Sequence, residues 1–302
     1  MTVDVLFPYY GDVAMMKQAV ESVLGQNSPD WTLTVVDDGY PDESIPGYFA
    51  DLVARDPRVT YLRNEQNLGA NGNYRKALTF VRNELAVVMG ADDVMLPNYI
   101  ETVVAAHERF PTAQIIQPGV VVIDEHDQPS MGLVDRVKRL LAPRVSGRRL
   151  LSGENLAISL MRGNWMYFPS VCWKSEDLVA TGFREGLDIC QDLALALDLI
   201  KAGGAMVIDD TVCFRYRRHR ASDSSWRALE GTRFIEERTF FNGMAQEFDA
   251  IGWKRAARTA RLHLSSRFNA ATLLPKAWRN KQHQGVRNLR DHVLARPGGA
   301  SR

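Results

Sequence analysis

The sequence is poor in cysteine and contains no long apolar run. Its three cysteines, Cys172, Cys190 and Cys213, are odd in number and widely spaced, and no two form a CxxC pair. This argues against a disulfide-stapled fold or a cysteine metal site, and we expect reduced thiols in a cytoplasmic protein. No stretch approaches the roughly 18 apolar residues of a membrane-spanning helix, and no basic segment precedes an apolar one at the N-terminus. We therefore expect neither a membrane span nor a signal peptide.

Two familiar nucleotide-binding motifs are also missing. The glycine-bearing polar loop at 67–75 lacks both the Walker pattern and the GxGxxG fingerprint. The remaining composition is that of an ordinary globular protein, with 45% hydrophobic and 24% charged residues. A length of 302 residues allows one large domain or two modest ones.

Charge of each sign is concentrated in a different part of the chain. From Lys254 to Arg302 there are 12 Lys or Arg and one acidic residue, which leaves 25 basic and 35 acidic residues elsewhere. Basic helices that carry leucine and tryptophan bind anionic membrane surfaces. We therefore predict membrane contact through 254–296 and through a basic segment at 135–149, which we expect to be a mobile or surface-seeking loop. The alternatives are that the tail packs on the acidic body or forms a homo-oligomer contact, while the acidic body argues against a nucleic acid partner.

The first half of the chain alternates between strand and helix patterns. Short apolar runs alternate with segments such as Val13–Leu24, which carries apolar residues at helical spacing. This rhythm predicts an α/β fold, with a mostly parallel central sheet flanked by helices. From about Arg227 onward we expect only helices. Strands are expected at 3–7, 33–36, 59–62, 86–89, 115–117, 120–123, 167–173, 205–208 and 212–216, and further helices at 44–55, 72–83, 97–110 and 190–202.

Two of the expected strands end in adjacent carboxylates. The strand at 86–89 leads into Gly90-Ala91-Asp92-Asp93, and the strand at 33–36 leads into Asp37-Asp38-Gly39. Ligands bind at the carboxyl ends of the strands in open α/β sheets. Paired carboxylates favour a divalent cation with a bound phosphate, so the pattern predicts a Mg²⁺ or Mn²⁺ site. The alternatives are helix N-terminal acids ahead of Pro97 and an ordinary Asp-Gly turn.

Three further segments carry residues suited to chemistry. The loop at 67–75 offers backbone N–H groups that can cradle phosphate. Asp192 opens a helix, either as a first-turn acid or as a general base that deprotonates a sugar hydroxyl. His219 is flanked by arginines, and it is either a polar surface residue or a metal ligand beside phosphate-binding arginines.

Together these segments resemble the family-2 glycosyltransferases, which have the GT-A fold. The resemblance covers roughly residues 2–225. It implies a nucleotide-sugar-binding and catalytic domain at 1–225, followed by a helical basic region at 226–302. Each segment alone is weakly specific, but six of them in the family's order are a strong signal. They are Val3 to Gly11, Val36 to Gly39, Asn67 to Arg75, Gly90 to Asp93, Gly182 to Asp192 and Tyr216 to Ser222.

The resemblance implies a metal-dependent, inverting transfer of a sugar from a nucleotide-diphosphate donor, with UDP-sugars favoured. The acceptor would be a hydroxyl of a glycan or lipid-linked molecule in cell-envelope synthesis. Asp192 corresponds to the catalytic base, and Asp93, with His219 assisting, to the ligands of Mn²⁺ or Mg²⁺. Asp38 would bind the nucleobase, and Asp92 the ribose or the donor sugar.

The resemblance also assigns contacts to both substrates. Acceptor contacts are expected at Asn164 and Trp165, where Trp165 is either a stacking platform or a buried core residue. Contacts to phosphate are expected at Arg217 and Arg218. The remaining donor contacts are expected from Pro8, Tyr9, Tyr10, Asn67, Gly69, Asn73 and Arg75.

Three positions depart from the family pattern. Gly90 stands where the first Asp of the Asp-x-Asp motif is expected, so metal contact would rest mainly on Asp93. Gln191 replaces the usual Glu before the base, and Tyr10-Gly11 replaces the usual Asn or Ser after the first strand. The alternatives to a glycosyltransferase are a metal-dependent sugar nucleotidyltransferase and a non-catalytic nucleotide-sugar or nucleic-acid binding protein.

Overall fold

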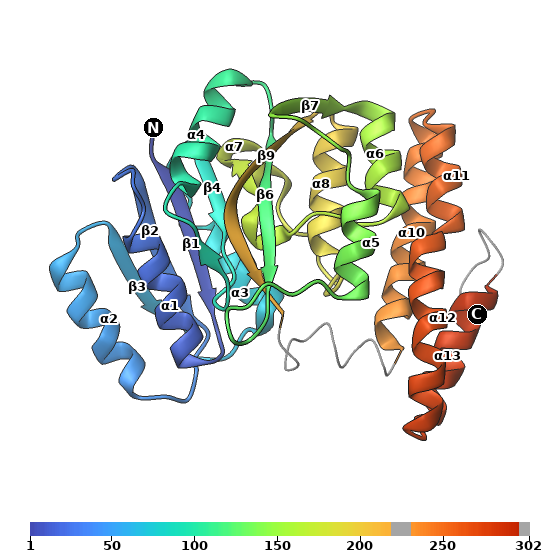
Figure 1. Ribbon diagram of the computed structural model, residues 1–302, viewed down its shortest axis with the longest axis horizontal. Coiled ribbons are helices and arrows are strands. Elements are labelled where there is room, and N and C mark those ends of the chain that lie inside the picture. Colours follow the sequence, from blue (N-terminus) through green and yellow to red (C-terminus); the bar gives the residue numbers. More distant parts are fainter. Residues whose placement is uncertain (219–230, 296–302) are drawn as a thin grey trace.

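The computed structural model describes residues 1–218 and 231–295, and it shows a twisted nine-stranded sheet covered by helices. Figure 1 shows helices α1 and α2 at one end and helices α10 to α13 at the other. The expected α/β class is confirmed. The strands are β1 (Val3–Tyr9), β2 (Trp31–Asp37), β3 (Val59–Arg63), β4 (Leu85–Val88), β5 (Val94–Met95), β6 (Ile115–Ile123), β7 (Arg148–Ser152), β8 (Cys172–Lys174) and β9 (Ala205–Arg217).

The helices flank this sheet and form the C-terminal part of the chain. No helix within 1–218 or 231–295 is long and apolar enough to cross a membrane. The helices are α1 (Val13–Leu24), α2 (Ser44–Arg55), α3 (Gly69–Leu78), α4 (Tyr99–Arg109), α5 (Leu133–Leu141), α6 (Gly153–Arg162), the 3₁₀ turn η1 (Phe168–Ser170), α7 (Ser175–Thr181), α8 (Gln191–Lys201), α10 (Thr232–Ala250), α11 (Lys254–Leu262), α12 (Leu264–Arg279) and α13 (His283–Leu294).

The order of the strands brings the polar strand ends to one edge. Eight strands run in the order β3-β2-β1-β4-β8-β6-β9-β5, and the ninth, β7, also pairs with β9. Strands β1 to β4 are parallel, β8 is antiparallel to both β4 and β6, and β6 is parallel to β9. The carboxyl end of β9 therefore shares an edge with those of β1, β2 and β4, at the bottom of Figure 1. Because α8 leads into β9 through a three-residue turn, the N-terminus of α8 lies at the same edge.

The second half of the chain departs from the expected elements. The two strands expected at 115–123 are one strand, β6, which continues through a register shift at Gln117–Gly119. A side chain at Gly119 would lie 2.7 Å from the Thr211 carbonyl oxygen, so a glycine there permits this close pairing. The two strands expected at 205–216 likewise form the single strand β9. The strand expected at 167–173 is the turn η1 followed by β8, and α6 and α7 were not anticipated.

The basic segment 135–149 is not a mobile loop, and that prediction is wrong. It contains most of α5, the turn after it and the start of β7. The α5 helix is amphipathic, with Val137 and Lys138 partly buried and Leu140 73% exposed. Its buried Asp135 joins it to Arg218 at 2.8 Å. Within this helix Arg136, Lys138 and Arg139 stand among the apolar residues and obscure the helical pattern in the sequence.

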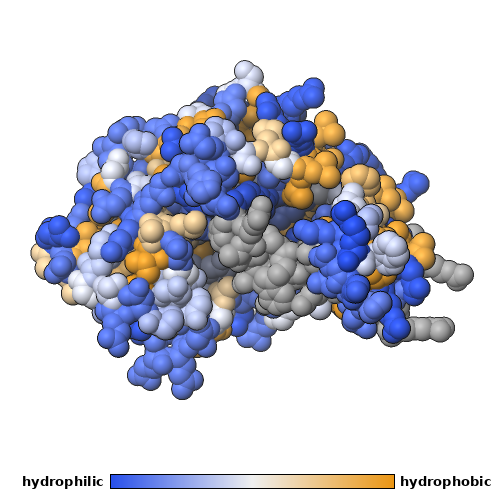
Figure 2. Space-filling model, turned by 60° about the horizontal axis from the view of Figure 1, so that its bottom comes forward, coloured by the Kyte–Doolittle hydropathy of each residue, from blue (hydrophilic) through white to orange (hydrophobic). Residues whose placement is uncertain are grey.

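The C-terminal helices pack on the rest of the protein. Phe241 and Phe248 of α10 and Ala257 of α11 belong to the same hydrophobic core as α6 and α8. Arg184 adds a polar tie between α8 and α10, because it binds both Asp198 (2.5 Å) and Glu247 (2.8 Å). The boundary at 225/226 therefore stays a prediction. Figure 2, which turns the bottom edge forward, shows hydrophilic residues over much of this face and a group of hydrophobic residues at its upper right.

Two buried histidines make the C-terminal bundle sensitive to acid. His263 and His292 are each 1% exposed. Burial, with neighbouring cationic side chains, lowers the pKa of His263 to about 4 and that of His292 to about 3. Both are neutral in the fold but protonate in the unfolded chain below pH ~6.5. Stability is therefore fully present above pH ~6.5 and falls toward the folded pKa values. We expect unfolding free energy to fall by up to about 2 kcal/mol per histidine between pH 7 and pH 5.

Urea unfolding across this pH range measures the effect. The double variant His263→Asn/His292→Gln removes both titrations and should flatten the pH dependence. His283→Gln on α13 is the matched control, because His283 is exposed and its replacement should leave the slope unchanged. Equal slopes in the wild type and the double variant would contradict this account.

Candidate active site

The acid pair at the end of β2, Asp37 and Asp38, accepts hydrogen bonds from the neighbouring loops. Asp38 is 1% exposed, and its Oδ1 accepts hydrogen bonds from Asn64 Nδ2 (2.7 Å) and the Leu68 N–H (2.8 Å). Asp37 accepts from the Tyr40 N–H (2.9 Å) and the Tyr61 hydroxyl (2.7 Å). Both carboxylates thus fix the loops around the strand end. A direct contact of Asp38 with a nucleobase stays a prediction.

Aromatic side chains stand at the end of β1. Pro8 and Tyr9 are buried within the strand, whereas Tyr10 is 55% exposed. The ring of Tyr10 meets that of Tyr40 edge-on at 5.1 Å, and the Tyr9 carbonyl accepts from the Asp38 N–H (2.8 Å). Of the three expected donor contacts here, Tyr10 is the one with an exposed side chain. An exposed ring beside a strand-end carboxylate is suited to a planar base.

The loop that opens α3 combines exposed and buried amides. Asn67 is exposed and accepts from the Gly69 N–H at 2.9 Å, while Gly69 has a positive φ of 71° that favours glycine. Arg75 is exposed on α3. Asn73 differs, because it is buried and donates to the Val36 carbonyl (2.8 Å). The structure therefore gives Asn73 a positioning role at the end of β2, and not the direct donor contact that the sequence predicted.

The second acid pair is deeply placed. Asp93 is 1% exposed, and its Oδ1 accepts from the Arg217 N–H at 2.8 Å. Burial, and then the charge of Asp92, raise the pKa of Asp93 well above its ordinary value. A side-chain carbon at Gly90 would lie 2.5 Å from Asp93 Oδ2. Gly90 therefore makes room for the Asp93 carboxylate itself.

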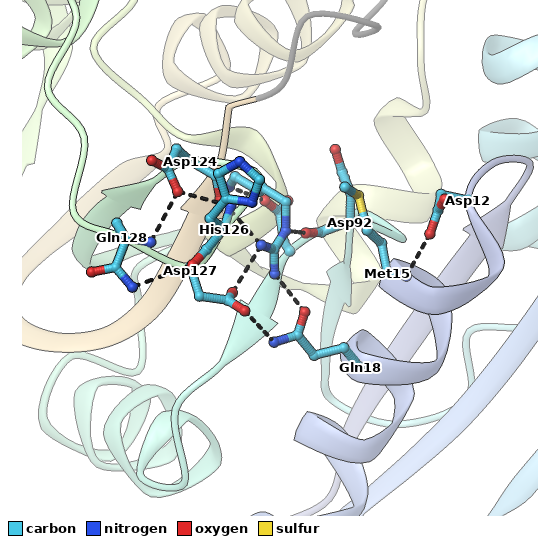
Figure 3. A network of polar contacts seen from close by, with 10 residues as sticks. Asp12, Met15, Gln18, Asp92, Asp124, His126, Asp127 and Gln128 are labelled. Carbon is cyan, nitrogen blue, oxygen red and sulfur yellow. Dashed lines mark hydrogen bonds and ion pairs between the residues drawn. The ribbon is translucent and has the colours of Figure 1, made fainter.

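Arg217 holds this acid pair from the end of β9. Its guanidinium donates to the Asp92 carbonyl (2.6 Å), to Gln18 (2.7 Å) and to the Asp124 carbonyl (3.2 Å), and it pairs with Asp127 (2.8 Å). Figure 3 shows Gln18, Asp92, Asp124 and Asp127 gathered at this point. The side chain is 2% exposed. The predicted phosphate contact of Arg217 is therefore not supported, because the protein already uses its donors.

The neighbouring positions have different outcomes. Arg218 is about one-third exposed and binds Asp135 at 2.8 Å, so its predicted phosphate contact stays a prediction. His219, the predicted metal ligand, lies outside the described residues.

The candidate base lies at the N-terminus of α8. Asp192 is partly exposed, and its Oδ2 accepts from Asn164 Nδ2 at 2.9 Å. An amide that holds one carboxylate oxygen fixes the orientation of the other. Trp165 is 4% exposed, and its indole N–H donates to Ser159 (3.2 Å). Of the two interpretations of Trp165, the structure supports the buried core residue and not the stacking platform.

The carboxylates that follow β4 and the carboxylate that opens α8 lie within electrostatic range of Tyr74, a residue that no pattern in the sequence had indicated. Burial raises the pKa of Tyr74, and the charges of Asp92, Asp93 and Asp192 raise it further. All three carboxylates therefore lie within electrostatic range of one hydroxyl. Tyr74 stands on α3, and its ring contacts those of Phe168 (5.8 Å) and Phe183 (5.9 Å). No sequence signal distinguishes Tyr74 from an amphipathic helix residue, because the convergence depends on tertiary packing.

A lysine on α5 faces the same region. Lys138 donates to the Met166 carbonyl (2.6 Å), and its ammonium lies 4.5 Å from the Tyr167 ring centre. Burial, and then the charge of Arg218, lower the pKa of Lys138 to about 8, while Asp192 and Asp135 oppose the shift. Because α5 was expected to be a mobile loop, the sequence analysis missed this residue.

The donor set for a cation is small. Within 1–218 and 231–295, no three His, Cys, Asp or Glu side chains cluster as metal ligands. Asp92 and Asp93 nevertheless fit Mg²⁺ or Mn²⁺, because proteins often hold Mg²⁺ with one or two carboxylates plus substrate phosphates and water. The raised pKa of Asp93 also means that its ionised form is unfavourable in this site, and a bound cation would stabilise that form.

Comparison with known proteins identifies similar sequences and folds. The family model described as glycosyl transferase family 2 matches residues 4–174. An uncharacterised protein of Mycobacterium tuberculosis is 27% identical over 244 residues, which is 78% of this chain and 73% of that protein. The Escherichia coli UDP-Glc:alpha-D-GlcNAc-diphosphoundecaprenol beta-1,3-glucosyltransferase WfgD is 30% identical over 99 residues, or 33% of this chain and 38% of that enzyme.

A solved structure extends the likeness of fold over the whole chain. The S. aureus TarS fragment 1-349 in complex with UDP-GlcNAc superposes with a TM-score of 0.59. The match covers 97% of this chain and 89% of that one, at 11% sequence identity. At that identity the likeness establishes the fold alone, and it includes the helical C-terminal region.

Proposed function

The chain belongs to glycosyl transferase family 2, and we propose that it transfers a sugar from a UDP-sugar to an acceptor hydroxyl with inversion at the anomeric carbon. The observation that carries this proposal is that Asp93, bound to Arg217 at the end of β9, and Asp192, in the first turn of α8, lie at the same edge of the sheet. One acidic pair lies at a strand end suited to a donor diphosphate, and the third carboxylate comes from the opposite helix. A site of this kind holds a donor and a nucleophile in one place.

Each side chain has a distinct task in this reaction. Asp192 removes the proton from the acceptor hydroxyl as that oxygen attacks the anomeric carbon, and Asn164 holds the carboxylate in line (2.9 Å). Asp93, with Asp92, would bind Mn²⁺ or Mg²⁺ beside the donor diphosphate, and such a cation stabilises the charge that develops on the leaving group. Asp38, Tyr10, Asn67 and Gly69 would surround the nucleoside.

The substrate class is supported by the names of similar proteins. The E. coli relative is named for a UDP-glucose donor and a diphosphoundecaprenol-linked acceptor. Another relative, at 27% identity over 111 residues, is named as a colanic acid biosynthesis glycosyl transferase. These names favour a UDP-sugar and a glycan or lipid-linked acceptor of the cell envelope. Both curated relatives match this chain over less than half of their length.

The transfer assay that tests the proposal also discriminates its main alternative. A sugar nucleotidyltransferase would be expected to carry a glycine-rich phosphate loop after β1, where this chain has Pro8-Tyr9-Tyr10-Gly11. We expect the protein to release UDP from a UDP-sugar when an acceptor and Mn²⁺ are present. Release of pyrophosphate from a nucleoside triphosphate and a sugar phosphate would instead identify the alternative enzyme.

We also propose a cytoplasmic protein that attaches to the inner surface of the cell membrane. Basic side chains such as Arg258, Lys276 and Arg279 are exposed on α11 and α12, together with Trp278 (74% exposed). Each basic residue near an anionic surface contributes about 1 kcal/mol. The alternatives remain a homo-oligomer contact and packing on the body, where the Arg255 N–H contacts Glu154 and Arg261 contacts Asp249.

Co-sedimentation with phosphatidylglycerol-containing vesicles measures this attachment. At low salt we expect most of the protein in the vesicle pellet, and about 0.5 M NaCl should release it because surface charges are screened. Neutral phosphatidylcholine vesicles are the control. Failure to pellet with anionic vesicles at low salt would rule out the electrostatic attachment.

A further inference from the structure

An apolar groove runs between α5 and α12 and ends beside the candidate base. Its walls are Val134, Val137 and Leu141 of α5, Leu193 of α8, Phe241 of α10 and Phe268 of α12. Asn164 and Cys190 also line the groove, and Asn164 is hydrogen-bonded to Asp192. The groove therefore continues from the position where an acceptor hydroxyl would lie.

The rim of the groove is also apolar. Leu133 and Val134 of α5 are 59% and 49% exposed, and Phe268 of α12 is 60% exposed. Large apolar side chains gathered on one surface of a soluble protein mark a binding site for an apolar partner. The hydrophobic group at the upper right of Figure 2 lies on the side of the molecule where α5 and α12 stand.

Cationic side chains are also part of the lining of the groove. Lys138 and Arg233 both contribute to the groove wall, and Arg218 lies close enough that its charge acts on Lys138. Arg218 and Arg233 have carboxylate partners, Asp135 and Glu237 respectively. Lys138 donates to the neutral Met166 carbonyl. An ammonium group bound to a neutral oxygen in a partly buried site gains most from an added anion.

We propose that this groove binds the acceptor as a phosphorylated lipid, with the apolar chain between α5 and α12 and the phosphate beside Lys138. The proposal rests on the proposed function, because it assigns the acceptor class of the same site. Arg233 and Glu237 of the lining neutralise each other, and Lys138, whose hydrogen bond goes to a neutral carbonyl oxygen, favours a lipid phosphate over a purely apolar occupant.

Binding of farnesyl diphosphate to the full chain, measured calorimetrically in EDTA without donor, tests the proposal. We expect farnesyl diphosphate to bind at least tenfold more tightly than either inorganic diphosphate or farnesol. Val137→Asp places a carboxylate in the wall and should weaken binding at least tenfold. Leu140→Asp is the matched control on the same helix, because Leu140 is 73% exposed and is not part of the wall. Lys138→Met should weaken farnesyl diphosphate more than farnesol.

Several results would overturn the proposal. Equal affinity for farnesyl diphosphate and inorganic diphosphate would show that the apolar chain does not bind in the groove. If Val137→Asp and Leu140→Asp changed the affinity for farnesyl diphosphate equally, with unchanged circular dichroism, the ligand would not bind in the groove. Loss of a dimer in Val137→Asp, seen by sedimentation, without loss of ligand binding would identify a second copy as the occupant. The binding assay needs no sugar transfer, so its failure leaves the proposed function untouched, and absent UDP release leaves the groove result untouched.

Discussion

Replacing Asp192 by Asn is expected to reduce the rate of sugar transfer by about 10²–10⁴-fold, the usual contribution of a general base. The amide has nearly the same shape, and its oxygen can still accept the hydrogen bond from Asn164 (2.9 Å). It cannot accept the proton of the acceptor hydroxyl. Because Asp192 lies on α8 and the donor site lies at the ends of β1, β2 and β4, UDP binding should be unchanged. Initial rates at saturating donor, with UDP affinity measured separately, give the two quantities.

Glu176→Gln provides the matched control for this variant. Glu176 is an exposed acid in the first turn of α7, as Asp192 is in the first turn of α8. Both substitutions remove a favourable charge from a helix N-terminus, which is worth roughly 0.3–1 kcal/mol of stability. Only Asp192→Asn should abolish transfer. If Asp192→Asn turned over at the wild-type rate, Asp192 would be a first-turn acid and the base would lie elsewhere.

Replacing Asp93 by Asn is expected to have two effects of opposite sign. The asparagine oxygen can still accept from the Arg217 N–H (2.8 Å), so the loop should keep its shape. A neutral amide holds a divalent cation poorly, and we expect activity to fall by about 100-fold or more. Burial raises the pKa of Asp93, so this carboxyl lowers stability fully above its folded pKa, and the loss fades as the pH falls from that value to the unfolded pKa of about 3.9. The metal-free variant should therefore melt a few degrees higher.

Chelation of the divalent cation with EDTA tests the metal dependence of the reaction independently. EDTA should stop transfer by the wild type, and added Mn²⁺ or Mg²⁺ should restore it. The residual activity of Asp93→Asn should respond little to either treatment. Full activity of the wild type in EDTA would remove the metal from the reaction, while a lower melting temperature of the metal-free variant would contradict the burial argument.

Local patterns in the sequence were sufficient for the N-terminal half of the fold. The helices at Val13–Leu24 and Ser44–Arg55 have the expected bounds, because apolar residues at helical spacing decide burial there. Strands ending in Asp37 and near Asp92 could likewise be predicted from apolar runs that stop at acids. The edge that these strand ends share follows from the parallel order of the sheet.

The missing parts depend on contacts distant in sequence. The α5 helix was hidden because its basic residues obscured the apolar face that lines the groove. Tyr74 and Lys138 enter the site through tertiary packing, which no spacing along the chain reveals. The basic residues next to Arg217 in the sequence favoured a phosphate contact. Its observed partners Gln18, Asp124 and Asp127 come from segments that are remote in the sequence. Asn73 was assigned to the donor, and Trp165 was left between a stacking platform and a core residue, because their burial could not be deduced locally.

The account's central claim is that the acidic edge of the sheet binds a nucleoside diphosphate through a divalent cation. Thermal unfolding of the wild type and Asp93→Asn with UDP, GDP, dTDP and their sugars, each with Mn²⁺ or with EDTA, tests this claim most directly. We predict that UDP and UDP-sugars raise the melting temperature of the wild type only with Mn²⁺, and that Asp93→Asn loses this increase. An equal increase in EDTA, or an undiminished one in Asp93→Asn, would contradict the claim.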